Sequence, residues 1–181
     1  MHRSKLLEML EDYAERYPAE ANTIERFVDF VNANERCFQR DCWAGHVTGS
    51  GWLVNANRDH VLLTHHKKLG RWLQVGGHSD GVADPLAVAI KEAEEESGLA
   101  VFPLDGTVFD IDIHEIPARK SLPAHFHFDV RFALGTSGGD AFQVSDESND
   151  LAWVPVERMD DYTDEESVLR MARKWLAEEA P

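Results

Sequence analysis

Three glutamates at helical spacing are the residues of this 181-residue chain best suited to chemistry: Glu92, Glu95 and Glu96. An α-helix turns about 100° per residue, so the three side chains fall within roughly 100° of one another on one face. Like charges at this spacing repel, so the helix gains no stability from them. Carboxylate oxygens are the ligands that Mg²⁺ and Mn²⁺ prefer. We therefore expect a divalent metal site here; the alternative is a solvated acidic helix face.

The helix that carries these glutamates has a defined start and end in the sequence. Asp84 fits an N-cap, Pro85 the first helical position and Gly98 the C-terminal stop. An apolar stripe lies about 120° from the glutamates, so one face can dock on a core while the other faces a cleft. The stripe consists of Leu86, Ala89, Ile90 and Ala93.

The segment from Gly77 to Leu99, a glycine-led loop followed by this helix, resembles the Nudix box. That pattern is Gly, five residues, Glu, seven residues, Arg-Glu-hydrophobic-any-Glu-Glu-any-Gly-hydrophobic. The matching positions are Gly77, Glu92, Ala93, Glu95, Glu96, Gly98 and Leu99. Two positions depart from it: Ala83 replaces the first glutamate, with Asp84 as a candidate substitute, and Lys91 replaces the arginine. Lysine keeps the charge but loses the bidentate fork.

The resemblance implies a fold and an activity. The fold is a Nudix-like α/β/α sandwich with a mixed sheet, and the reaction is hydrolysis of a diphosphate linkage in a nucleoside diphosphate derivative, such as a nucleotide sugar or a dinucleotide. The implied cofactor is Mg²⁺ or Mn²⁺, held by the Gly77 carbonyl, Glu92, Glu95 and Glu96. Glu95 or Glu147 is the expected general base, with Asp146, Asp150 and Glu115 as rivals for the loop carboxylate. Lys91 can orient Glu95 through an i,i+4 pair.

Residues 125–132 alternate strictly between polar and aromatic or apolar side chains, as a strand with two different faces does. The polar residues are His125, His127, Asp129 and Arg131. We expect this face to contact substrate, with Arg131 suited to a phosphate and the histidines to proton transfer or hydrogen bonding. A solvent-facing strand is the alternative.

Weaker candidates surround these two segments. Lys67, Lys68 and Arg71 form a basic cluster that either meets a substrate phosphate or occupies a turn. The remaining histidines look scattered, and we expect them to be structural, with satisfied hydrogen bonds: His46, His65, His66 and His78.

Three other functions fit a Nudix-like chain less well. A catalytically silent nucleotide-binding module is the main rival, because Ala83 and Lys91 depart from the pattern; the intact glutamates argue against it. An isomerase of this fold would need a cysteine-histidine motif that Cys37 and Cys42 lack. A transcriptional regulator would need a basic DNA-binding module.

Composition sets the remaining expectations. The net charge of −15 argues against DNA as a partner, and no apolar run reaches membrane length. We expect a soluble, cytoplasmic protein, a possible homodimer, that acts on a small phosphorylated substrate. Two cysteines are too few for a disulfide framework and are expected to be reduced.

Hydrophobic periodicity predicts an N-terminal helical extension at 1–34, packed on a Nudix hydrolase domain at 35–181. The extension should cover one edge of the sheet; the alternative is a role in dimerisation or substrate specificity. Helices are predicted at 4–17, 20–33 and 165–178 besides the box helix. Strands are predicted at 46–54, 61–65, 72–75, 107–116, 125–134 and 151–155.

Overall fold

The computed structural model of the protein describes residues 2–67, 69–119, 122–144 and 148–178. Its α-helices are α1 (Ser4–Arg16), α2 (Ala21–Ala33), α3 (Pro85–Ser97) and α4 (Glu166–Glu178). Its strands are β1 (Gly45–Val54), β2 (His60–His66), β3 (Trp72–His78), β4 (Val101–Ile116), β5 (His125–Thr136) and β6 (Ser148–Pro155). The strands form a mixed six-stranded sheet in the order β4-β5-β1-β3-β2-β6. The predicted α/β class and N-terminal helices are confirmed.

All six strands extend beyond their predicted ranges, and β3, β4 and β6 do so by three residues or more. Strand β3 continues through Gly77 and His78, which the sequence pattern placed in a loop. A Cβ at Gly76 would lie 2.7 Å from the Ser50 Cβ, so the glycine permits an approach to β1 that another residue would block. Strand β4 begins at Val101 instead of residue 107, because tertiary pairing overrides the interruption by Pro103 and Gly106 in the sequence.

The described residues group into two compact units, and several strands pass from one unit to the other. The first unit comprises Met1–Ser50, Gly76–Ala89 and Gly106–Phe132. The second comprises Gly51–Val75, Ile90–Asp105 and Ala133–Pro181. Helices α1 and α2 therefore share a unit with parts of the sheet, while the domain boundary predicted at residue 34 stays a prediction.

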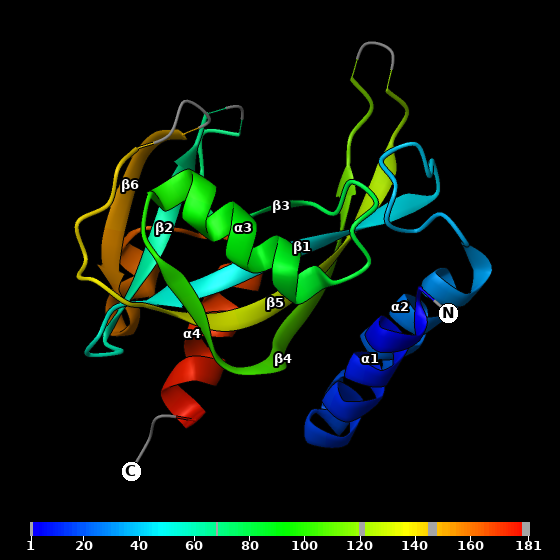
Figure 1. Ribbon diagram of the computed structural model, residues 1–181, viewed down its shortest axis with the longest axis horizontal. Coiled ribbons are helices and arrows are strands. Elements are labelled where there is room, and N and C mark those ends of the chain that lie inside the picture. The colour runs from blue at the N-terminus through cyan, green and yellow to red at the C-terminus, as the bar shows by residue number, and fades with distance from the viewer. Residues whose placement is uncertain (1, 68, 120–121, 145–147, 179–181) are drawn as a thin grey trace. The chain divides into compact units, whose positions relative to one another are not determined.

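In the first unit, α1 and α2 lie side by side (Figure 1), and α2 packs on the sheet through aromatic rings. The Phe30 ring of α2 stacks on the Phe128 ring of β5 with a centroid distance of 3.7 Å, and Phe27 meets the same ring edge-on at 5.3 Å. Arg16 Nη2 donates to the Val108 carbonyl of β4, the edge strand, at 2.6 Å. The helical hairpin formed by α1 and α2 thus provides a hydrogen-bond partner for a carbonyl of the edge strand, which limits edge-to-edge association.

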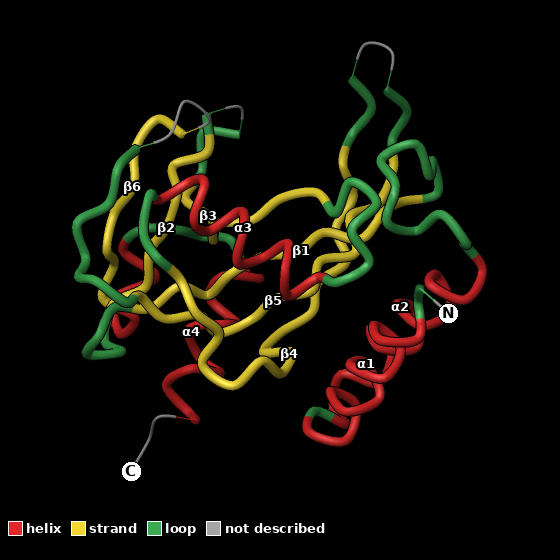
Figure 2. Tube along the Cα trace, in the orientation of Figure 1, coloured by secondary structure: helices red, strands yellow, loops and turns green. Residues whose placement is uncertain are grey.

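In the second unit, β2 pairs antiparallel with both β3 and β6, and Figure 2 shows β2 and β6 running side by side. Leu62 and Leu63 of β2 are fully buried, and Trp175 of α4 donates its ring N–H to the Arg58 carbonyl at 2.9 Å. This unit also holds the acidic part of α3.

Two further findings bear on the expectations from composition. Among the described residues, no helix has the length and apolar character needed to cross a membrane. Cys37 and Cys42 are both free thiols, as predicted.

Candidate functional site

The acidic face of α3, defined by Glu92, Glu95 and Glu96, is built within a single helix. The Lys91 ammonium lies between two of these carboxylates, 3.0 Å from Glu92 Oε1 and 2.8 Å from Glu95 Oε2. The side chain of Glu95 is 61% exposed and that of Glu92 is 20% exposed, so one carboxylate reaches solvent and the other is partly covered. Hydrogen bonds to Glu95 and Glu92 raise the pKa of Lys91.

The chemistry of these donors, rather than their present spacing, suits a divalent cation. The ammonium group marks a position where positive charge is already stabilised by two carboxylates, and the oxygen donors are those that Mg²⁺ and Mn²⁺ prefer. Glu96 lies one turn beyond Glu92 on the same face and is half-buried. A dication held here would compete with Lys91 for the same carboxylate oxygens.

The ends of α3 follow the predicted pattern at the backbone. Pro85 is the first helical residue, and Gly98 ends the helix with φ +69° and a bond from its N–H to the Glu94 carbonyl at 2.8 Å. Within the first unit, a Cβ at Gly49 would lie 2.5 Å from the Pro85 carbonyl oxygen, so this glycine lets β1 approach the start of α3 closely.

Asp84 directly precedes α3, and its carbonyl accepts a bond from the Val88 N–H at 3.1 Å, but its side chain has another partner. Its Oδ2 pairs with Lys5 of α1 at 2.5 Å, and its Oδ1 is buried without a hydrogen-bond partner among the described residues. The carboxylate is therefore engaged by the helical hairpin instead of capping α3. Its proposed replacement of the missing box glutamate at Ala83 gains no support from this contact.

Several predicted site residues have other partners or lie outside the described residues. Arg71 forms an ion pair with Glu165, so its guanidinium is already engaged. Lys68, Asp146 and Glu147 lie outside the described residues. Gly77 is a strand residue of the first unit, and its role as a metal ligand stays a prediction.

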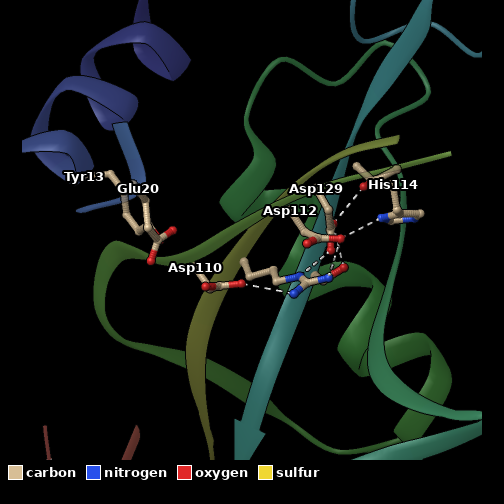
Figure 3. Close-up of polar contacts among 9 residues, drawn as sticks. Tyr13, Glu20, Asp110, Asp112, His114 and Asp129 are labelled. Carbon is tan, nitrogen blue, oxygen red and sulfur yellow. Dashed lines mark hydrogen bonds and ion pairs between the residues drawn. The ribbon is translucent and has the colours of Figure 1, made fainter. Parts of the chain in front are cut away.

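The polar face of β5 divides into two parts, and its inner part is a buried ionic cluster (Figure 3). Arg131 is 1% exposed and donates through Nε to Asp129 Oδ2 at 2.7 Å and through Nη1 to Asp110 Oδ2 at 3.1 Å. Thr48 and Ser50 of β1 donate to the other oxygen of Asp129 at 2.7 and 2.8 Å. The alternative of a solvent-facing strand is wrong for these two β5 residues.

The cluster explains why a charged residue is stable in this interior. Burial opposes the charge on Arg131, but Asp129, Asp110 and Asp112 outweigh it and raise the pKa of the guanidinium. With its donors directed at carboxylates, Arg131 is placed to hold β4, β5 and β1 together. Its predicted contact with a substrate phosphate stays untested.

The charge of Asp110 in the same cluster also affects a tyrosine of α1. Burial, followed by the charge of Asp110 and the acceptor Glu20, raises the pKa of the Tyr13 hydroxyl, which donates to Glu20 Oε2 at 2.8 Å. Figure 3 shows Tyr13 and Glu20 on the side of Asp110.

The outer part of the β5 face belongs to a group of imidazoles, here called the histidine row: His114 of β4, His125 and His127 of β5, His46 of β1 and His78 of β3. These strands are consecutive in the sheet, and all five residues lie in the first unit. His46 lies 4.8 Å from His127, 4.9 Å from His125 and 5.1 Å from His78 between ring centroids.

A glycine at the start of β1 brings His46 into the row. Gly45 has φ +147°, and a Cβ there would lie 2.6 Å from the Phe126 carbonyl oxygen. The close approach of β1 to β5 therefore depends on the missing side chain.

The expectation that His46 is a hydrogen-bonded structural histidine is wrong. It is 3% exposed, and neither of its ring nitrogens has a hydrogen-bond partner among the described residues. Burial, with smaller contributions from His78 and His125, lowers the pKa of His46 to about 4. Burial and the neighbouring His114 lower the pKa of His127 to about 2. Both rings are neutral at pH 7 and available as ligands.

The sequence signal for this row was limited to the pair His125 and His127, two residues apart on one strand face. The other members lie on separate strands, and only the strand order brings them together.

Comparison with known proteins assigns the fold to a family. The model of the NUDIX domain matches residues 46–176, which include the acidic face of α3 and every strand from β2 to β6. The chain belongs to the Nudix family. It therefore carries the domain of a Nudix-type pyrophosphohydrolase, a class that generally uses divalent metals such as Mg²⁺ and acts on small phosphorylated substrates. A comparison with curated protein sequences found no match.

Solved structures agree with the Nudix α/β/α sandwich. An Ap4A hydrolase from C. elegans is 18% identical with a TM-score of 0.61, over 72% of this chain and 95% of that one. The MutT protein from Methanosarcina mazei Go1 is 17% identical with a TM-score of 0.62, over 76% and 96%. A NUDIX-family hydrolase from Clostridium perfringens is 26% identical with a TM-score of 0.53, over 74% and 98%.

Proposed function

We propose that this Nudix protein is a metal-dependent hydrolase that cleaves the diphosphate linkage of a nucleoside diphosphate derivative, such as a nucleotide sugar or a dinucleotide. The observation that carries the proposal is the pairing of the Glu92 and Glu95 carboxylates around one cationic nitrogen on α3.

The residues of α3 have distinct roles in this proposal. Glu92, Glu95 and Glu96 would hold the cation, and Glu95, the most exposed of the three, would also accept a proton from the attacking water. Lys91 orients the Glu95 carboxylate through the 2.8 Å contact to Oε2. A bound Mg²⁺ or Mn²⁺ would supply an activated water and neutralise charge on the diphosphate. Glu147 is the second candidate for the base and lies outside the described residues.

The test is a panel of nucleoside diphosphate derivatives, including Ap4A because one structural neighbour is an Ap4A hydrolase, assayed with Mg²⁺, with Mn²⁺ and with a chelator. Phosphorus NMR identifies the products. Metal-dependent turnover of any member that disappears in Glu95→Gln supports the proposal. Tight binding of a member without turnover under either metal contradicts it and favours the catalytically silent module.

A further inference from the structure

We infer that His46, His125 and His127 form a binding site for a transition-metal dication of the Zn²⁺ class, separate in its ligands from the carboxylates of α3. One ligand atom from each residue lies within 4.8 Å of the others, and they are the one such group of three among the described residues. The inference goes beyond the proposed function, which uses the oxygen donors of α3.

The separation of the ligand atoms suits closure on an ion. Zinc binds imidazole nitrogen at 2.0–2.1 Å, which places the nitrogens of a tetrahedral site about 3.4 Å apart. The three ligand atoms lie within 4.8 Å of one another, so side-chain rotations that move each ring nitrogen by about 1 Å would bring them to that separation. The strands that carry the rings, β1 and β5, are neighbours in the sheet.

Unpartnered nitrogens are an independent sign of a ligand. Buried polar side chains are hydrogen-bonded in nearly all native structures. His46 is 97% buried, and neither its Nδ1 nor its Nε2 has a partner in the described part of the chain; the same holds for Nε2 of His127. A metal ion would engage one nitrogen of each ring, whereas an apolar core position would not need two imidazoles.

His125 has the hydrogen bond that metal-binding histidines usually make. Its Nδ1 lies 2.9 Å from the Pro123 carbonyl oxygen. Because a carbonyl only accepts, Nδ1 carries the proton, and Nε2 of the neutral ring keeps its lone pair for a metal. Such a contact to a carbonyl fixes the tautomer and orientation of metal ligands.

The neighbouring charges favour a cation. The ionic cluster of the same unit contains three carboxylates and one guanidinium, which leaves it with an excess of negative charge. Asp112 reaches the histidine row directly, because its Oδ2 lies 3.0 Å from His114 Nδ1 and the His114 ring lies 5.2 Å from His127. A dication beside these rings would be stabilised by that excess.

The donor set defines the class of ion. Imidazole suits Zn²⁺ and its transition-metal neighbours, whereas carboxylate and water suit Mg²⁺. A site with three histidines leaves a fourth position open, as catalytic zinc sites do, and that position would take water or an oxygen of a phosphorylated ligand. This donor set differs in kind from that of α3.

The first measurement uses the wild-type full chain. Metal-free protein is given one equivalent of Zn²⁺, and X-ray absorption fine structure counts the imidazole ligands. We expect three nitrogen ligands with the multiple-scattering signature of imidazole. Coordination by oxygen alone, or by one imidazole, overturns the inference without depending on any variant.

The second measurement titrates Co²⁺ into wild type and variants and follows its visible ligand-field absorption. His125→Ala, at the least buried ligand, and His127→Ala should each weaken binding by at least about 100-fold, since second-shell changes alone cost 10- to 100-fold. His60→Ala, a histidine of β2 in the other unit, and Glu95→Gln should keep wild-type affinity. Circular dichroism checks that each variant is folded.

Equal affinity in folded His125→Ala and wild type overturns the site, as does a Co²⁺ signal that disappears in Glu95→Gln. Failure of this inference would not contradict the proposed hydrolase activity, because that activity is assayed separately with Mg²⁺ and Mn²⁺.

Discussion

The acidic face of α3 and the histidine row are two candidate metal sites built in opposite ways. The acidic face comes from five consecutive residues of one helix and presents hard oxygen donors, one of them 61% exposed. The histidine row comes from four strands, consists of one buried and four partly exposed rings and presents nitrogen donors. A helix brings neighbours in sequence onto one face, whereas a sheet gathers residues that are far apart. A site within one helix can thus be recognised from sequence spacing, whereas a site assembled from several strands can be recognised only from the tertiary structure.

The largest expected effect tests whether the acidic face is the catalytic one. Glu95→Gln keeps the size of the side chain but removes a base and a ligand, so kcat should fall by about 10²- to 10⁴-fold. The matched control is Glu94→Gln, which changes an exposed carboxylate on the other side of the same helix turn and should stay within about twofold. Steady-state kinetics on the substrate found in the panel measures both. A similar loss of kcat in the two variants would contradict the assignment of catalysis to the helix face that carries Glu95.

The next effect concerns the ionic cluster that supports the strands of the histidine row. Arg131→Met removes the buried guanidinium that pairs with Asp110, Asp112 and Asp129, and should lower the free energy of unfolding by about 3–5 kcal/mol. Arg36→Met, which breaks an exposed pair with Asp41, should cost less than about 1 kcal/mol. Urea unfolding compares the two, and equal losses would refute a structural role for the cluster.

The histidine row predicts a pH dependence that the acidic face does not. Burial lowers the pKa of His46 to about 4 from an unfolded value near 6.5, so the unfolded state binds more protons between these values. Stability contributed by the neutral ring is full above pH 6.5 and is lost as pH falls toward 4. Between pH 7 and 5 the loss is about 2 kcal/mol.

Denaturant unfolding of metal-free protein in chelator at several pH values measures this loss. The charges that act on His46 besides its imidazole neighbours are Arg40, which favours the neutral ring, and Asp80, which opposes it. His46→Gln cannot titrate and should show a shallower dependence on pH. An unchanged slope in this variant would assign the effect to other groups.

The smallest effect concerns the departure from the Nudix pattern at Lys91. Lys91 already contacts Glu92 and Glu95, and helical pairs of this kind are worth about 0.2–0.5 kcal/mol. Lys91→Arg, which restores the residue of the family pattern, should change kcat/KM by less than about threefold. A gain of tenfold or more would show that the bidentate fork of arginine matters at this position.

Elements with strong local signals could be predicted from the sequence. Both N-terminal helices, the box helix between Pro85 and Gly98 and the strict alternation of β5 follow from periodicity and capping residues. The first part of β4 could not be predicted in this way. Phe102 and Leu104 lie where a Cβ at Gly135 would approach them within 3.0 Å, and that packing with β5 makes the segment a strand.

The candidate sites divide along the same line. The sequence by itself determined the acidic face, because three glutamates on one helix are neighbours whatever surrounds them. It also placed His125 and His127 on one face of a strand. Only the tertiary structure decided that Arg131 and Asp129 are buried in an ionic cluster and that His46 joins His125 and His127. Strand order is a long-range property, set by packing across the sheet, and no local spacing encodes it.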